Sequence, residues 1–324
     1  MKRQLRNPGL WLSLAITAAF ALWPALAGNQ AYARETAFTI LKAVTFASSL
    51  NILLGYTGYV SFGHIVFFGL GGYVGFYLMD EHNAHLALAV LAGGLSAALL
   101  AFLLGKAILR LRGAYFALAT IGVNEAMRAF VKNFEPFGGS TGMTLNFKVY
   151  QSFGGPDQAL WIAYVTVAAL SLIVVLVSFL VKTSRFGLGL QAIRENEDAA
   201  EVMGVVAPNA KTWAYVLSAL FPGMLGVLFF FKNGNVEPRD AFVLHQSIEA
   251  IVMVMLGGQG TVLGPILGGA VYQRLRGLLL VSPLFKNIQL AVAGVLLLVI
   301  VLFVPAGVVG WLRGRFSRLR RVLE

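Results

Sequence analysis

The chain has 324 residues, of which 58% are hydrophobic and only 12% are charged. A soluble domain carries about 25% charged residues, which it needs to cover its outer surface. Lipid, in contrast, accepts an apolar exterior. The composition therefore excludes a soluble protein and predicts an all-α, polytopic membrane protein.

The formal net charge is +11 at pH 7. In a soluble protein such a surplus would indicate nucleic acid or acidic partners. Here Lys and Arg gather in short groups that flank apolar stretches, which is how basic residues orient membrane helices. We therefore expect contact with membrane lipid and none with nucleic acid. The chain has no cysteine, which excludes disulfides, thiolate metal sites and cysteine nucleophiles.

About ten stretches are apolar and long enough to span a bilayer, some of them interrupted, because a spanning helix needs about 20 mostly apolar residues. If the amino terminus is inside, most basic residues outside these stretches fall on the cytoplasmic side. We therefore expect both termini to be cytoplasmic. The predicted spans are 11–27, 37–54, 64–79, 86–105, 114–131, 159–181, 212–231, 242–256, 262–281 and 287–310.

The first apolar stretch has two interpretations. Its basic start and the small residues Ala25-Leu26-Ala27 are typical of a signal peptide with a cleavage site. The same stretch can instead be retained as the first spanning helix. We expect a retained helix, because the apolar stretch is long for the core of a signal peptide.

Two short, uncharged, glycine-rich segments interrupt the hydrophobic pattern, GYTGYVSFGH at 55–64 and GGQGTVLGPILGG at 257–269. Broken segments at matching places in two halves of a transporter indicate a binding site, because irregular backbone is tolerated where it lines a cavity. The alternatives are close helix packing at small residues, and polar side chains that only satisfy the freed backbone groups. Candidates for lining a solute path near the middle of the membrane are Tyr56, Thr57, Ser61, His64, Gln259 and Thr261.

The most charged stretch of the chain lies in a long loop at about 182–211, which the order of spans places on the cytoplasmic side. Asn196 is typical of a helix N-cap, Glu197 and Asp198 favour the positive end of a helix, and Gly204 suits its end. These residues predict a short, capped helix outside the membrane. Because a loop that only joins two spans can be short, the helix indicates docking of another protein, the alternative being a solvated surface helix.

Charged residues also fall inside predicted spans, where each must be paired or functional. Glu249 and Arg274 lie at similar depth in neighbouring spans, so we predict an ion pair between them. Alternatively, Glu125, Arg128 and Glu249 would be the ion machinery of a secondary transporter that works without partners. A passive channel or scaffold is a third possibility for the chain.

Motifs for catalysis do not stand out in the sequence. There is no G-x-x-x-x-G-K-[ST] phosphate loop, so ATP, with its Mg²⁺, would have to bind another chain. There is also no H-E-x-x-H motif and no evident set of Ser, His and carboxylate. We therefore expect a chain that is not an enzyme, without catalytic residues, metal site or cofactor of its own.

Five stretches closely resemble, in order, the signature segments of the permease subunit of branched-chain amino acid ABC importers. The resemblance covers about residues 37–310 and implies one permease domain, 1–324, in a bacterial inner membrane. It also implies a homologous second permease subunit, two cytoplasmic ATPase subunits and a periplasmic solute-binding protein. Relatives with these motifs are associated also with urea, short amides and other small acids. The stretches are LGYTGYVSFGHIVFFGLGGY, LRLRGAYFALATIGVNEAMR, FGGSTGM, SRFGLGLQAIRENEDAAEVMGV and SIEAIVMVMLGGQGTVLGPILGG.

The resemblance further implies that the predicted loop helix couples the permease to the ATPase. Residues 198–204 are similar to the E-A-A-x-x-x-G segment of ABC importer permeases, with Asp in place of Glu and without the Leu-Pro that commonly follows. Small alanines would let a partner surface approach closely, and charged side chains would contact it at the rim. The expected coupling residues are Arg194, Glu195, Asp198, Ala199, Ala200 and Gly204.

Overall fold

The computed structural model describes residues 7–28, 31–281, 291, 294–295 and 307–315. It is a bundle of helices with one two-stranded antiparallel sheet, in which Met143 pairs with Val236. The elements are α1 (Pro8–Leu26), α2 (Ala31–Thr57), α3 (His64–Glu81), α4 (Leu86–Ile108), α5 (Ala114–Lys132), η1 (Glu135–Phe137), β1 (Met143–Thr144), α6 (Phe147–Gln151), α7 (Pro156–Thr183), α8 (Arg185–Glu195), α9 (Glu197–Val202), α10 (Ala207–Asn233), β2 (Asn235–Val236), α11 (Pro238–Ala241), α12 (Leu244–Gly257), α13 (Leu263–Val281) and α15 (Gly307–Arg315).

Six segments of the described chain are long and apolar enough to cross a membrane, namely α1, α2, α4, α7, α10 and Pro238–Gly257. This confirms a polytopic helical protein. The stretches expected at 64–79, 114–131 and 262–281 also form helices, namely α3, α5 and α13. These three helices are not among the six that are long and apolar enough to cross a membrane. The last expected span, 287–310, lies mostly outside the described residues, so the count of ten stays a prediction.

Helix α2 forms the centre of the bundle. In its most apolar window 89% of the residues are buried, and it contacts α1, α7, α10, α12 and α13. Beside it, α3, α4 and α10 approach one another through glycines. A Cβ added to Gly223 of α10 would lie 2.6 Å from the carbonyl oxygen of Gly93 in α4. The small residues therefore do bring backbones together, as close helix packing requires.

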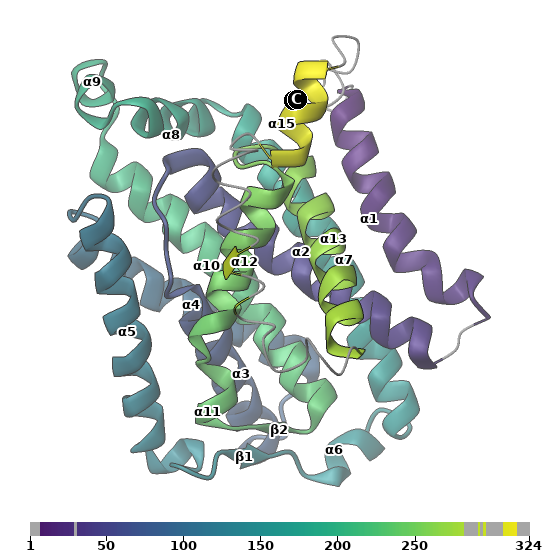
Figure 1. Ribbon diagram of the computed structural model, residues 1–324. Coiled ribbons are helices and arrows are strands. Elements are labelled where there is room, and N and C mark those ends of the chain that lie inside the picture. Colours follow the sequence, from purple (N-terminus) through teal and green to yellow (C-terminus); the bar gives the residue numbers. More distant parts are fainter. Residues whose placement is uncertain (1–6, 29–30, 282–290, 292–293, 296–306, 316–324) are drawn as a thin grey trace.

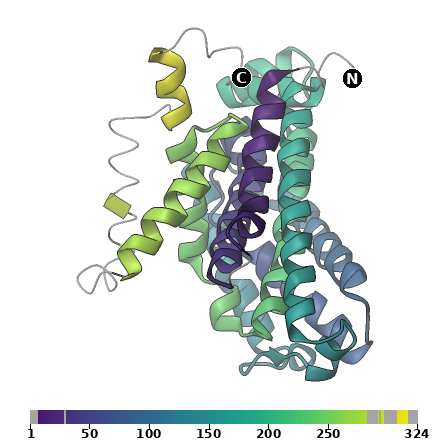
Figure 2. The same cartoon turned by 90° about the vertical axis from the view of Figure 1, so that its right-hand side faces the viewer.

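The two ends of the bundle differ in structure. Figure 1 shows α8 and α9 at one end, together with the start of α1 and with α15, whereas β1, β2, α6 and α11 lie at the other end. The view in Figure 2 shows the same separation from the side. Helix α2 ends at the α8–α9 end, and the non-helical residues 58–63 run back into the bundle before α3 begins (Figure 1).

The separation of the two ends makes the membrane orientation testable by cysteine labelling, since the chain has no native cysteine. Asn83, Lys148 and Asn235 are exposed at the β1–β2 end, and Arg110 and Glu201 are exposed at the α8–α9 end. Single cysteines at the first three positions should react with an impermeant maleimide in intact cells. Cysteines at the last two should react only after permeabilisation, and labelling of residue 201 from outside would contradict the orientation.

Candidate functional site

The two glycine-rich segments, which are far apart in the sequence, meet at the end of α2. Asn51 joins them, because its Nδ2 donates to the carbonyl oxygen of Thr261 at 2.9 Å and its Oδ1 accepts from the backbone N–H of Gly260 at 3.0 Å. Gln259 adds a bond from Nε2 to the carbonyl oxygen of Leu54 at 2.9 Å. We call residues 54–58 and 258–261 together the glycine junction.

Arg194 connects helix α8 to both halves of the glycine junction. Its Nη1 donates to the carbonyl oxygen of Gly55 at 2.8 Å. A Cβ at Gly58 would lie 3.3 Å from Arg194 Cγ, and a Cβ at Gly260 would lie 2.7 Å from Nη1. Both glycines also have positive φ, +78° and +75°, which other residues rarely adopt. From the sequence we expected Arg194 to contact the ATPase at the rim of the docking surface. In the structure its guanidinium instead contacts both halves of the glycine junction.

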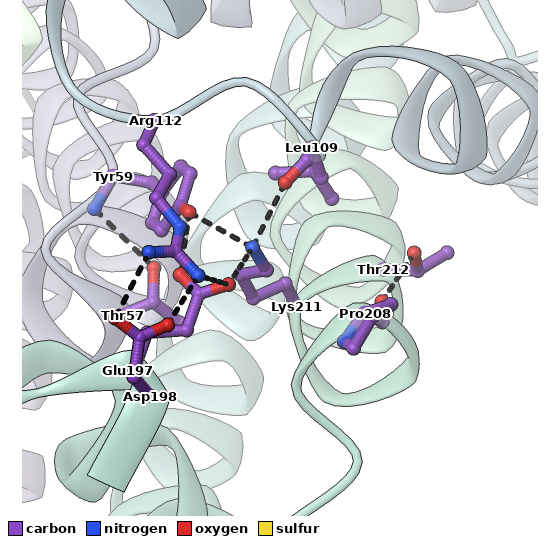
Figure 3. Close-up of polar contacts among 9 residues, drawn as sticks. All are labelled: Thr57, Tyr59, Leu109, Arg112, Glu197, Asp198, Pro208, Lys211 and Thr212. Atoms are coloured by element: carbon purple, nitrogen blue, oxygen red, sulfur yellow. Dashed lines mark hydrogen bonds and ion pairs between the residues drawn. The ribbon is translucent and has the colours of Figure 1, made fainter. Parts of the chain in front are cut away.

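Lys211 attaches helix α9 to the bundle (Figure 3). Its Nζ lies 2.7 Å from Glu197 Oε1, and it donates to the hydroxyl of Tyr59 and to the carbonyl oxygen of Leu109, each at 2.8 Å. Tyr59 in turn donates to Glu197 Oε2 at 2.8 Å. We call these four residues the Lys211 cluster. It joins α9, the segment after α2, the end of α4 and the start of α10, and Lys211 is only 2% exposed.

The carboxylates of α9 are held ionised by their neighbours. Burial by itself would raise the pKa of Glu197, but hydrogen bonds from Lys211 and Tyr59 lower it below its usual range. A hydrogen bond from Arg112, Nη2 to Oδ1 at 2.8 Å, lowers the pKa of Asp198. A carboxylate whose pKa is lower in the folded protein than in the unfolded chain stabilises the fold in its charged form, so this contribution to folding stability is present at neutral pH. It is lost as the pH falls through the lowered pKa values.

Helix α9 has the caps that the sequence predicts. Asn196 Oδ1 accepts from the backbone N–H of Ala199 at 3.0 Å, and Gly204 follows the helix with φ +91°. The expectation that Ala200 faces a partner is wrong, because the side chain of Ala200 is 3% exposed and is buried against other residues of the same chain. The side chains that do project are apolar, with Val202 86% and Met203 84% exposed.

The other expected coupling residues are exposed, as a docking role requires. Glu195, Asp198, Ala199 and Gly204 all lie on the surface of the loop. Their contact with a partner stays a prediction.

The expected path residues divide into two groups. Four of them form hydrogen bonds within the chain: Tyr56 with Ser178, Thr57 and Gln259 with backbone carbonyls of α2, and Thr261 with Gly258 and Gly264 next to α13. This supports the interpretation that such side chains satisfy backbone groups at a break. Gly260, which lies between Gln259 and Thr261, is next to Arg194 of α8. The expected place of these residues in a solute path near the middle of the membrane stays a prediction.

Ser61 and His64 form the second group of expected path residues. Both side chains are fully buried. The hydroxyl of Ser61 lies beside that of Tyr215, and the ring nitrogens of His64 have no hydrogen bond of good geometry among the described residues. The backbone of Ser218 is the polar group beside the imidazole. His64 is otherwise enclosed by aromatic rings, with its centroid 5.5 Å from that of Phe67 and 6.0 Å from that of Tyr215.

The predicted pair between Glu249 and Arg274 is wrong. Glu249 Oε2 instead lies 3.1 Å from Nη1 of Arg276. Residues two positions apart in a helix point in directions that differ by about 200°. Arg276 therefore faces α12, while Arg274 is exposed and lines a cavity with α1 and α2.

The residues expected for ion coupling do not come together. Glu125 and Arg128 pair with each other at 3.6 Å on the exposed side of α5. Glu249 is paired on α12, with Arg276 of α13. The arrangement therefore gives the secondary-transporter interpretation no shared site.

Three residues that hold α9 against the bundle, namely Tyr59, Arg112 and Lys211, were not predicted from the sequence. One signal was available: Lys211 stands in the first turns of an apolar helix of spanning length, where an unpaired ammonium is costly. Its partner Glu197 was assigned only to the positive end of α9. No local pattern connects residues 59, 112 and 211, since they meet only through the packing of separate helices.

A bundle of apolar helices with a charged, capped helix at one end is the architecture of a multi-pass membrane protein. The sequence profile of the family described as "Branched-chain amino acid transport system / permease component" matches residues 32–302. The chain belongs to this family.

Named relatives carry the same description. The chain is similar to the high-affinity branched-chain amino acid transport system permease protein LivM of Escherichia coli, with 30% identity over 241 residues, 67% of this chain and 56% of that protein. LivM of Salmonella typhimurium is 27% identical over 277 residues, 78% and 64%, and LivH of the same organism 25% over 307 residues, 84% and 94%. The match thus covers less than two thirds of each LivM protein. No solved structure matches significantly.

We predict that Lys211→Met detaches α9 from the bundle. The change leaves the carboxylate of Glu197 without its buried cation, with only Arg112 Nη2 at 3.5 Å, and the carbonyl oxygen of Leu109 without a donor. Breaking a buried pair on one side costs about 3 kcal/mol, so backbone amides of 197–204 should exchange hydrogen much faster. Lys106→Met is the control, because that ammonium is exposed and rests over the ring of Phe102. Equal exchange in both variants would refute the anchoring role of Lys211.

Proposed function

We propose that the chain is the membrane permease of an ATP-driven importer for branched-chain amino acids or a related small polar solute. The observation that carries the proposal is the bond from Arg194 to Gly55, because it links the loop helix α8 to the end of α2 and, beside Gly260, to the segment before α13. The family membership and the names of the relatives support the same reading. An importer for urea or short amides is the alternative within the family.

The proposed assembly contains several other chains. Both LivM and LivH of one organism resemble this chain, which supports pairing with a homologous second permease. Two cytoplasmic ATPase subunits would bind ATP and Mg²⁺, since the chain has no phosphate loop. A periplasmic binding protein would deliver the solute. The arrangement requires a bacterial inner membrane with α8, α9 and both termini on the cytoplasmic side.

The exposed end of α9 is suited to dock on the ATPase. Val202 and Met203 form an apolar tip outside the membrane, and exposed apolar tips rimmed by polar groups mark protein contacts. Around the tip, Glu195 and Asp198 supply charge, and Gly204 permits the exit of the chain by its positive φ. In this proposal Ala199 allows close approach, whereas the buried Ala200 shapes α9 from inside.

Motion would pass from this tip to the glycine junction through two contacts. The Lys211 cluster makes α9 move with the ends of α4 and α10. Arg194 transfers the displacement of α8 to the carbonyl oxygen of Gly55 and to Gly260. The solute path would then open next to the segment that follows α2, where Ser61 and His64 remain the candidates to face it.

We predict that Val202→Asp combined with Met203→Asp prevents docking of the ATPase subunits. Two carboxylates would be desolvated in an apolar contact, which should reduce co-purification of the ATPase and stimulated ATP hydrolysis by about tenfold or more. Phe147→Asp is the matched control, because Phe147 is an exposed apolar residue at the opposite end of the bundle. Normal ATPase retention in the double variant would contradict the docking surface.

Arg194→Ala should separate ATP hydrolysis from transport. The variant keeps the tip of α9 and the Lys211 cluster, so the ATPase should still bind and hydrolyse ATP in reconstituted vesicles. Because the link to the glycine junction is lost, we expect solute uptake to fall by about tenfold, the equivalent of one charge-assisted hydrogen bond. Arg185→Ala on the same helix is the control. Uptake at the normal rate in Arg194→Ala would rule out this route of coupling.

A further inference from the structure

A second group of charged residues lies within the bundle, away from the glycine junction. Lys42 of α2 is about 16 Å along its helix from Ala31, at 1.5 Å per residue. Its Nζ lies over the ring of Phe229 at 3.8 Å from the centroid and interacts electrostatically with Glu249 and Arg276. Three helices of the bundle, α2, α12 and α13, therefore bring two cations and one carboxylate close together.

The cations of this group are only partly paired among the described residues. Glu249 binds Nη1 of Arg276 at 3.1 Å, but the buried Nε of Arg276 has no hydrogen-bond partner. Lys42 has neither a carboxylate within salt-bridge distance nor a hydrogen bond, and its contacts are the rings of Phe229 and Phe68. The nearby carboxylate of Glu35 is already engaged, because it lies 2.7 Å from Lys232 Nζ.

Such an arrangement is costly in a membrane unless an anion completes it. A buried charge without a hydrogen-bonded partner is strongly disfavoured, and here the surplus is positive. A neutral solute would leave that surplus in place. A carboxylate would offset it and would accept from both an ammonium and a guanidinium, which form strong charge-assisted hydrogen bonds.

A cavity next to the group has room for a small molecule. It has a volume of about 440 Å³ and lies between α2 and α13. Its lining includes Thr39, Arg276, Arg274 and Glu35, and Lys42 lies beside it rather than in the lining. Lys42 is three residues beyond Thr39, so the two lie on the same face of α2. The size is within the range of small-molecule sites, about 300 to 1,000 Å³.

We propose that Lys42 and Arg276 bind the carboxylate of the transported solute at this place, which we call the carboxylate site. Glu249 holds the guanidinium of Arg276 in position, and the ring of Phe229 offers an apolar surface beside the ammonium. The inference rests on the proposed import function and narrows it, because it assigns a carboxylate-bearing solute and excludes urea and neutral amides as the main cargo.

The test measures binding to the assembled permease and ATPase complex, purified without the binding protein. Radiolabelled leucine is the probe, with three unlabelled competitors: 4-methylpentanoate, which keeps the carboxylate, 3-methylbutylamine, which keeps only the amine, and leucinamide. The carboxylate site predicts competition by 4-methylpentanoate and none by the other two. This comparison uses the unmodified protein, so it does not depend on the folding of a variant.

Matched substitutions then locate the site. Lys42→Gln and Arg276→Gln should each weaken leucine binding by about tenfold or more, the effect of losing a hydrogen bond to a charged group. Lys42→Arg should retain binding, because it keeps the charge. The controls are Lys148→Gln, an exposed lysine of α6, and Arg239→Gln, an exposed arginine of α11, neither of which lines this cavity. Both controls should bind leucine normally.

Three results would overturn the carboxylate site: no leucine bound by the unmodified complex, competition by the amine or amide equal to that of the acid, or normal binding in Lys42→Gln. ATP-driven uptake by the same complex in vesicles is measured in parallel. If uptake occurs while any of these results is found, only the carboxylate site fails. If no solute is taken up with ATP, the proposed import function itself fails.

Discussion

The hydrogen bond from Arg194 to the carbonyl oxygen of Gly55 is the contact on which the rest of the arrangement depends. The carbonyl oxygen of Gly55 lies in the last turn of α2, where the helix itself offers no backbone donor, so it needs a donor from elsewhere. The chain takes that donor from α8. A displacement of α8 would therefore act on the end of α2 and, through Gly260, on the segment before α13.

The same requirement explains why two positively charged side chains have opposite surroundings. Lys211 is almost completely buried, yet it has a carboxylate, a hydroxyl and a carbonyl oxygen within 2.8 Å, so its charge is balanced and its role is attachment. Lys42 has aromatic rings around it and, within the described part of the chain, no such acceptor. A buried cation that is fully paired stabilises the structure. A buried cation without a paired acceptor is destabilising until an anion binds to it.

Individual residues show how far local sequence could be read. Asn196 and Gly204 were assigned correctly as helix caps, because capping depends on neighbours within a few residues. Arg276 was missed as the partner of Glu249, because Arg274 and Arg276 lie at a similar depth along α13. Only the rotation of α13 about its axis decides which of the two arginines faces Glu249. Ala200 was assigned to an outer surface because its size suits close approach, but a small residue suits an internal contact equally well.

The sequence by itself determined the solvent, the class and the family: its apolar stretches require a bilayer, and its glycine-rich segments and capped loop helix are properties of short stretches of chain. Only the tertiary structure decided that the two glycine segments touch, that Arg194 lies between them, and that Lys211 meets Glu197, Tyr59 and the end of α4. The physical reason is that hydropathy and capping act over a few residues, whereas these contacts depend on how far each helix is rotated and shifted against its neighbours.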